Sequence, residues 1–336
     1  DGQRGRLLPK TRYVAFGDAG AAAWAAPVGS YGLAASPAKC APGSRMIVDM
    51  DGQGQAPGRL PVVGGWRARR VPTDPSGDVK EFESLAKVSQ GRLGYLKMDV
   101  DNLGYLMAHG LRGEDADRSS ISRVATLSRT LELFFSGYLE SLLRAEYQDI
   151  YLVYSGGDDV LAIGPWSRVL DLALRLRKEF RRFTAGNRAW SLSAGVAVVH
   201  HKTPVLAAAN EADELLKVSK TIPGAGFLPV PSDGEPRGSP TKDRITAFGV
   251  SMPWNGFEAA MASARRLLKW MQEGVVNTGK ARRLLKYARM YREFQRTGDT
   301  RQFEYAPLLA YDISRNWQGI GAAFQEARVW AAGLGT

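Results

Sequence analysis

The chain has 336 residues, a net charge of +11, and hydrophobic and charged contents of 44% and 24%, which predict a globular protein with room for two or three domains. Cys40 is the only cysteine, which excludes a disulfide framework and a cysteine-based zinc site, so we expect no zinc in this chain and a reducing, cytoplasmic setting. No run of about 18 apolar residues occurs, so we expect no membrane partner.

The first 80 residues are rich in Gly, Ala and Pro and predict a small, irregular β region that serves as a linker. The chain begins at Asp1 with no initiator Met and no signal-peptide pattern. This beginning indicates the cut end of a longer polypeptide or a separately built subunit.

Residues 81–250 have the pattern of an α+β domain. A long helix is expected to begin after Ser119 or Ser120 and to reach about residue 147, with an apolar stripe facing the sheet. The order β-α-β-β-α-β predicts a ferredoxin-like palm of the kind found in GGDEF and nucleotidyl cyclase domains. The stripe comprises Val124, Leu127, Leu131, Phe134, Phe135, Tyr138 and Leu142. The expected strands are 94–100, 150–154, 160–163 and 190–199, and the further helices are 167–183 and 204–220.

The C-terminal third changes character. Pro and Gly recur through 221–242 and predict a mobile loop, and a final edge strand is expected over 244–250. Residues 251–336 have helical periodicity and predict a small helical bundle.

Two apolar, strand-like runs carry carboxylates at their ends. One is KMDVDN, from Lys97 to Asn102, and the other is YSGGDD, from Tyr154 to Asp159. Asp99 together with Asp158 and Asp159 can hold a pair of Mg²⁺ or Mn²⁺ ions for nucleotidyl transfer. The alternative for the second run is an ordinary hairpin turn without a metal. The occurrence of both runs in one palm-like order favours the metal site over this alternative.

Several neighbouring residues are candidate nucleotide ligands. The two turn glycines permit a tight turn and a close approach to phosphate. Asp101 is expected to point to the same side as Asp99, because alternate residues of a strand share a face. Each of the others has a structural alternative. For Asn102 it is a turn cap, for Ser155 an ordinary strand end, and for Lys220 and Lys242 an exposed surface position. The candidates are Asp101, Asn102, Ser155, Gly156, Gly157, Lys220 and Lys242.

The net positive charge indicates a polyanionic partner. Much of the excess falls in the C-terminal third, where basic residues recur on one helical face. That face either contacts RNA or a partner subunit, or is simply solvated. Its members are Arg282, Lys286, Arg289 and Arg296.

Several motifs together resemble the large subunit of type III CRISPR effector complexes, the Cas-ten family, and most closely its Csm (III-A) branch. The similarity covers about residues 80–320, and the first 80 residues resemble the family's linker more weakly. The motifs are LKMDVDNLG (96–104), SRVATLSR (122–129), VYSGGDD (153–159), LSAG (192–195) and YDISRN (311–316).

The resemblance implies an enzyme that converts ATP to cyclic oligoadenylates when target RNA binds the guide RNA of the complex. Asp158 and Asp159 match the family's catalytic metal-binding aspartates, Asp99 matches the metal aspartate of the first strand, and Gly156 and Gly157 match the turn glycines. The implied partners are guide and target RNA and the backbone, small and guide-end-capping subunits. The helical domain resembles the part that packs on the small subunits.

The family's HD nuclease, first palm and zinc-binding cysteines have no counterpart in these residues, and no histidine is followed by aspartate. We therefore do not expect single-stranded DNA cleavage from this chain, and we expect the first palm to come from another chain or segment. Two other functions stay open: a diguanylate cyclase of the GGDEF type, which would prefer GTP, and an inert palm in a ribonucleoprotein scaffold.

Overall fold

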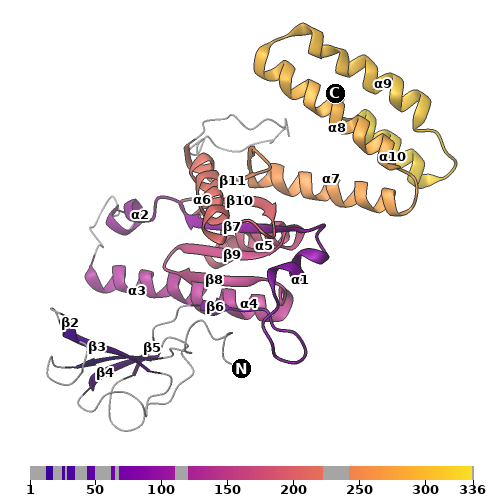
Figure 1. The fold of residues 1–336 in the computed structure, drawn as a ribbon. Helices are drawn as coiled ribbons and strands as arrows, with labels where there is room; N and C mark the ends of the chain where they lie inside the picture. The colour runs from indigo at the N-terminus through magenta and orange to yellow at the C-terminus, as the bar shows by residue number, and fades with distance from the viewer. Residues whose placement is uncertain are drawn as a thin grey trace. The chain divides into compact units, whose positions relative to one another are not determined.

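The computed structural model describes strands within residues 13–70 and then residues 71–109, 120–221 and 242–334. Most of the predicted loop at 221–242 lies outside these residues. The chain divides into two compact units, Asp1–Trp254 and Asn255–Thr336 (Figure 1). This division falls close to residue 251, the predicted start of the helical domain.

Five of the N-terminal strands form a sheet of their own, in the order β2-β3-β1-β4-β5. They are β1 (Tyr13–Gly17), β2 (Ala25–Ala26), β3 (Gly29–Ala34), β4 (Ser44–Asp49) and β5 (Val62–Gly64). The next strand, β6 (Ala68–Arg70), instead pairs with β8 at the edge of the second sheet. The palm sheet therefore begins before residue 81, its predicted boundary.

The second sheet has the order β12-β11-β10-β7-β9-β8-β6. Its central four strands, β10-β7-β9-β8, have the ferredoxin-like arrangement, which confirms the predicted α+β palm. The predicted edge strand at 244–250 is wrong, because Phe248 and Gly249 adopt left-handed φ angles of 52° and 72° and turn the chain into a hairpin. The strands are β7 (Arg92–Val100), β8 (Tyr151–Gly156), β9 (Asp159–Pro165), β10 (Leu192–His200), β11 (Arg244–Ala247) and β12 (Val250–Pro253).

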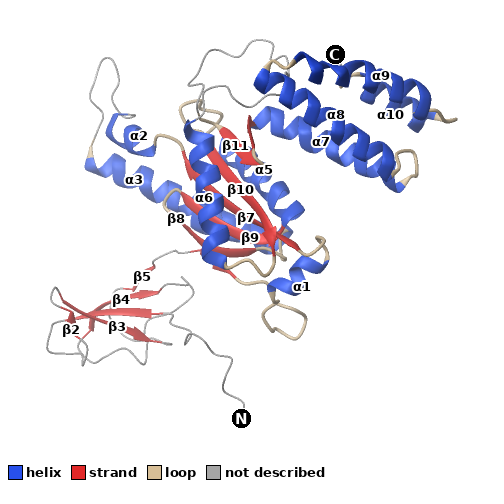
Figure 2. Cartoon of the chain, turned by 45° about the horizontal axis from the view of Figure 1, so that its top comes forward, coloured by secondary structure: helices blue, strands red, loops and turns tan. Residues whose placement is uncertain are grey.

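Helices cover both faces of this sheet (Figure 2). A Cβ atom on Gly195 would lie 2.3 Å from Ala212 O of α6 (Val205–Thr221), and one on Gly94 would lie 3.0 Å from Trp166 Cα of α5 (Trp166–Phe183). Gly195 pairs with Lys97, whose side chain points away from the face of Gly94. The two glycines thus let α6 and α5 approach opposite faces closely.

The predicted long helix is a succession of α3 (Ile121–Glu132), the π-helical segment η2 (Leu133–Tyr138) and α4 (Leu139–Glu146). Ser120 caps it as predicted, accepting a hydrogen bond from Arg123 N. The predicted apolar stripe is wrong at its beginning, since Val124 and Leu127 are only half-buried. It is also broken at Tyr138, which is 39% exposed, because a π-helical turn rotates the residues that follow it.

Two short helices complete the palm, α1 (Phe82–Lys87) before β7 and α2 (Leu103–His109) after it. Leu85 and Ala86 of α1 pack with Leu93 and Tyr95 of β7 in one buried cluster. No described helix is long and apolar enough to cross a bilayer.

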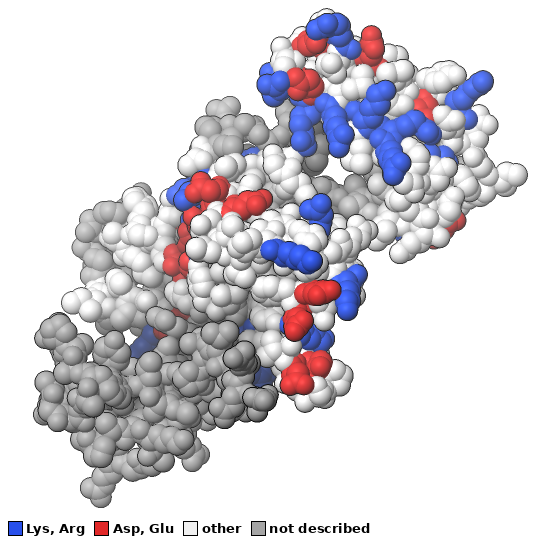
Figure 3. All heavy atoms as spheres, in the orientation of Figure 1, with Lys and Arg blue, Asp and Glu red and all other residues white. Residues whose placement is uncertain are grey.

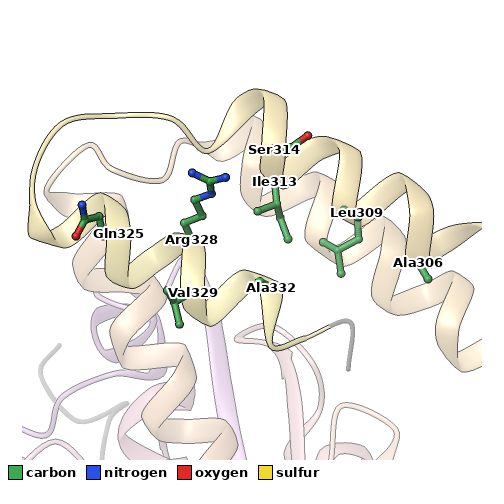
Figure 4. A pocket seen from close by; sticks show the side chains of 9 residues that line it. Ala306, Leu309, Ile313, Ser314, Gln325, Arg328, Val329 and Ala332 are labelled. Carbon is green, nitrogen blue, oxygen red and sulfur yellow. The ribbon is translucent and has the colours of Figure 1, made fainter.

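The C-terminal unit is a helical bundle, as predicted. Its core gathers around the buried Trp270, Tyr287, Ile313 and Trp317. Its elements are α7 (Trp254–Gln272), α8 (Thr278–Thr297), the 3-10 helix η3 (Thr300–Glu304), α9 (Tyr305–Asn316) and α10 (Ala322–Ala332). A mainly apolar groove runs between α9 and α10, and its described lining residues include no carboxylate (Figure 4); they are Ala306, Leu309, Ala310, Ile313, Ser314, Gln325, Arg328, Val329 and Ala332.

Candidate functional site

Three carboxylates meet at one end of the palm sheet. Asp99, near the end of β7, pairs in register with Asp159 at the start of β9. Asp158 lies in the turn between β8 and β9, where Gly157 has a φ of 67°. That left-handed angle is open to glycine at little cost, and it returns the chain to β9 within two residues. The paired runs identified in the sequence therefore converge as expected.

Lys97, Asp99 and Asp159 share one face of the sheet, because Lys97 and Asp99 are two residues apart and Asp159 is opposite Asp99. Lys97 Nζ donates to Asp159 Oδ2 at 2.7 Å. Tyr154 Oη also donates to Asp159 Oδ2, at 2.9 Å, and Lys97 Nζ contacts the same hydroxyl. Lys220, at the end of α6, forms an ion pair with Asp99 Oδ2.

The proximity of the carboxylates changes their acidity. Burial, together with the hydrogen bond and the negative charge of Asp99, raises the pKa of Asp158 to about 6. Burial also raises the pKa of Asp159, while the hydrogen bond and charge of Lys97 oppose the increase. Asp159 Oδ1 is buried and has no hydrogen-bond partner. The ionised carboxylates of Asp158 and Asp159 would therefore be stabilised by additional positive charge.

Among the described residues, no three Asp, Glu, His or Cys side chains form a ready-made metal cage. Mg²⁺ does not require one, because it is usually held by one or two carboxylates together with water and substrate phosphates. The unpartnered Asp159 Oδ1 and the raised pKa of Asp158 fit such an ion. Asp99, Asp158 and Asp159 are the side chains that would hold it.

Residues 92–225 match the family model described as Cas10/Cmr2, second palm domain. Over these residues the chain is similar to a Cas10/Cmr2 second palm. The match includes β7 to β10 and α6, and thus all three carboxylates and Lys220.

Curated relatives of this chain include Cas10/Csm1 proteins of subtype III-A, which are named as single-strand-specific deoxyribonucleases of CRISPR systems. The protein of Methanocaldococcus jannaschii is 37% identical over 193 residues, which are 53% of this chain and 23% of the relative. The protein of Enterococcus italicus is 42% identical over 129 residues, which are 38% of this chain and 16% of the relative. The chain therefore spans less than a quarter of either relative.

Solved structures share the fold. A Csm1–Csm4 cassette in complex with pppApApA has a TM-score of 0.65 and 23% identity, with 92% of this chain and 45% of that chain covered. A Csm1–Csm4 cassette in complex with cA4 has a TM-score of 0.64 and 24% identity, with 95% and 47% covered. The likeness extends beyond the second palm into the rest of the chain.

The side chain of Asp101 does not lie beside that of Asp99, where strand alternation predicts it. Its carboxylate is fully buried and accepts hydrogen bonds from Ser191 Oγ and Ser193 Oγ, each at 2.7 Å, and from the backbone N–H of Asp243 at 3.0 Å. The alternation rule fails because β7 ends at Val100, so Asp101 is no longer on the strand. The prediction that Asp101 contacts a nucleotide is corrected: it is an internal anchor of the second palm.

Ser155 is also turned inward. Its hydroxyl is buried and donates to Phe135 O at 2.6 Å, a carbonyl of the π-helical segment η2. Direct binding of a phosphate or ribose by this hydroxyl is corrected in favour of the alternative, a serine at a strand end. Its bond nevertheless ties the strand that leads into the Gly-Gly turn to the neighbouring helix.

The other predicted ligands lie near the carboxylates. Asn102 follows Asp101 with a φ of 57°, and its Oδ1 accepts a hydrogen bond from Lys242 Nζ. A Cβ atom on Gly156 or Gly157 would meet nothing within 4 Å, so the turn leaves open space beside its backbone. Contact of these residues with a nucleotide remains a prediction.

Sequence reasoning missed Lys97 and Tyr154 as parts of the site. Lys97 had a usable signal, since a residue two positions before Asp99 on a strand shares its face. Tyr154 had none, because a β-bulge shifts the register between Leu152 and Tyr154 and removes the simple alternation. Sequence reasoning also missed Arg177 and Asp243, which form a bidentate ion pair with hydrogen bonds of 2.8 and 2.7 Å.

In the helical unit, the four predicted basic residues are all exposed on α8, and basic side chains gather on the visible face of this unit (Figure 3). Arg282, Lys286 and Arg289 line a shallow groove together with Gln302. Arg296 differs from them, because its guanidinium pairs with Glu293 at 2.6 Å. Contact of this face with RNA or a partner subunit remains a prediction.

Proposed function

We propose that this chain supplies the second palm of a large subunit that makes cyclic oligoadenylates from ATP in a type III-A CRISPR effector complex. The observation that carries the proposal is the convergence of Asp99, Asp158 and Asp159 at the Gly-Gly turn. The family match supports it, and so do the ligands named for the similar Csm1–Csm4 structures, which include one ATP, pppApA, cA3 and cA4.

The reaction is a nucleotidyl transfer. The 3′-oxygen of one adenosine forms a bond to the α-phosphorus of a second ATP, the bond from that phosphorus to the β-bridging oxygen breaks, and pyrophosphate leaves. The 3′-hydroxyl loses its proton to a base or to water. Mg²⁺ held by Asp99, Asp158 and Asp159 would supply a Lewis acid for the phosphoryl oxygens and lower the pKa of the attacking hydroxyl.

The chain's own residues prepare this chemistry. The ammonium groups of Lys220 and Lys242 lie against Asp99 and Asn102, and they are the cations proposed to bind the triphosphate. The open space at Gly156 and Gly157 lets a phosphate approach the backbone of the turn. Lys97 and Tyr154 hold Asp159 in place through hydrogen bonds to its Oδ2.

Joining two nucleotides requires a donor and an acceptor, so the proposal includes a first palm that faces this one. The other proposed partners are guide RNA, target RNA, and the backbone, small and guide-end-capping subunits. The similar solved structures pair Csm1 with Csm4, one of them as a subcomplex of the type III-A interference complex, which supports a second protein subunit as a partner. Cleavage of single-stranded DNA, for which the curated relatives are named, is not assigned to the second palm.

The test is mass spectrometry of the products formed with Mg²⁺ from ATP, and from GTP in a parallel incubation, by the complex that copurifies with this chain. It is run with and without RNA complementary to the bound guide. Cyclic oligoadenylates that appear only with the complementary RNA are expected. Intact ATP with RNA bound would instead indicate an inert palm in a scaffold, and a cyclic dinucleotide made from GTP would indicate a diguanylate cyclase.

A further inference from the structure

Residue 243 is held from two sides. Its backbone N–H donates to Asp101 Oδ2 at 3.0 Å, just beyond the end of β7. Its carboxylate receives two parallel hydrogen bonds from Arg177 of α5, Nε to Oδ1 at 2.8 Å and Nη2 to Oδ2 at 2.7 Å. Bidentate pairs of this kind fix orientation as well as distance. The main chain and the side chain of Asp243 are thus fixed by two separate elements.

Both anchors are themselves rigidly placed. The Asp101 carboxylate is fully buried, and each of its oxygens accepts a bond from a serine hydroxyl, Ser191 or Ser193, at 2.7 Å. The side chain of Arg177 is only 8% exposed, whereas that of Asp243 is 42% exposed. The folded protein loses stability when a buried guanidinium is left without its carboxylate partner, and this cost keeps Arg177 and Asp243 paired.

The backbone at this point is strained. Asp243 and Asn102 have φ angles of 60° and 57°, in the left-handed region that non-glycine residues seldom adopt. Such conformations persist where surrounding contacts over-determine them. Here the contacts hold Lys242, which precedes Asp243, so that its ammonium group meets Asn102 Oδ1, three residues beyond Asp99.

We propose that Asp101 and Arg177 are positioning residues: by holding Asp243 from two sides, they place Lys242 for the triphosphate of the nucleotide. The inference rests on the proposed function, because it assumes that Lys242 contacts the substrate. Neither anchor touches the substrate itself. Asp101, a candidate ligand in the sequence, thereby acts on the nucleotide only through residue 243.

A double-mutant cycle tests this chain of contacts. The intact effector complex is titrated with AMPPNP and Mg²⁺ in four forms: wild type, Lys242→Ala, Arg177→Gln, and the two combined. Each single change should weaken AMPPNP binding about tenfold, the loss of one charged hydrogen bond. Because both act through one contact, the combined variant should bind no more weakly than Lys242→Ala alone. Arg175→Gln is the matched control, since Arg175 lies on the same helix and pairs with Glu146 at 3.2 Å instead.

Additive losses in the combined variant, or wild-type binding by Arg177→Gln, would overturn the inference. If Arg177→Gln does not assemble, the same cycle is made with Asp243→Asn. This change keeps the backbone N–H that donates to Asp101 but weakens the bidentate pair with Arg177. Additivity in that cycle also overturns it. Wild-type complex that binds no AMPPNP would contradict the proposed function instead, so the two failures are distinguishable.

Discussion

Asp99 and Asp159 are directly opposed across β7 and β9, and each carboxylate pairs with a lysine from another element: Asp99 with Lys220 of α6, and Asp159 with Lys97 of β7. Each of these two opposed carboxylates therefore has a lysine ammonium group beside it. A divalent ion would enter a site in which the lysine ammonium groups already compensate the carboxylates. Binding of metal and of triphosphate should accordingly be coupled, because the phosphates offer Lys220 a new anionic partner as the metal takes Asp99.

Replacing Asp158 and Asp159 together by alanine should abolish product formation while the complex still assembles. The loss should exceed about a hundredfold, because the proposed metal would lose two of its three carboxylates. The readout is cyclic oligoadenylate by mass spectrometry, with assembly followed by size-exclusion chromatography. Asp149→Asn is the control, since Asp149 pairs with Arg168 at 3.4 Å and lies outside the carboxylate cluster. Undiminished product in the double variant would refute the assignment of the metal ligands.

The raised pKa of Asp158 predicts opposite pH trends for stability and for metal binding. Since its pKa is about 6 in the folded chain and 3.8 ordinarily, the folded state holds the proton more tightly. The metal-free protein should lose stability, relative to Asp158→Asn, as the pH rises from about 4 through 6. Urea unfolding at a series of pH values measures this difference. A wild type whose stability runs parallel to that of Asp158→Asn across this range would contradict it.

Mg²⁺ competes with the same proton, so its apparent affinity should fall as the pH drops below about 6. Titration of Mg²⁺ into the AMPPNP-bound complex at pH 5 and pH 7.5 tests this trend. We expect weaker binding at pH 5, and the pH dependence should be smaller in Asp158→Asn, in which Asp159, whose pKa is also raised, still takes up a proton. Equal Mg²⁺ affinity at both pH values in the wild type would contradict the assignment of Asp158 as a ligand.

Gly157 and Gly156 should respond differently to alanine, although both are in the turn. Gly157 has a φ of 67°, where an alanine costs about 1–2 kcal/mol, whereas Gly156 has no positive φ and open space for a Cβ atom. Gly157→Ala should therefore lower the free energy of unfolding by about 1 kcal/mol, and Gly156→Ala should leave it nearly unchanged. Chemical denaturation of both variants compares them. Equal losses would show that the turn can rearrange.

Much of the palm was predictable from local pattern. The strand order β10-β7-β9-β8 follows from the β-α-β-β-α-β succession, and the convergence of Asp99 with Asp158 and Asp159 follows from their places at strand ends. The N-terminal cap of α3 at Ser120 was also predictable from the sequence. In each case a short-range rule of spacing or turn chemistry decides the outcome.

The errors arose where tertiary contacts decide. Asp101 and Ser155 have the composition of ligands, but hydrogen bonds to Ser191, Ser193 and Phe135 O turn them inward. The local sequence does not predict these hydrogen-bond partners. Arg177 was invisible for the same reason, because its partner Asp243 lies on a different element far along the chain. A π-helical segment and a β-bulge removed the simple periodicity on which the other predictions depended.

The exposed basic face of α8 provides the last prediction. Arg282, Lys286 and Arg289 are at helical spacing and line one groove, and Glu293 is the only acidic side chain among the described residues that line it. If the face binds the phosphates of RNA, changing all three to glutamate should weaken RNA binding by the complex. It should also flatten the dependence of binding on salt, by about 0.7 to 0.9 in log–log slope for each phosphate that the face no longer neutralises.

The matched control is Arg315→Glu, an exposed basic residue of α9 in the same unit. It changes the net charge of the unit without touching the α8 groove, so it should leave the salt slope nearly unchanged. RNA affinity measured from about 50 to 300 mM salt separates a localised contact from a general effect of charge. An equal change of slope per charge in both variants would mean that α8 is a solvated face. Failure of the triple variant to join the complex, with Arg315→Glu assembling normally, would mean that the groove contacts a partner subunit instead.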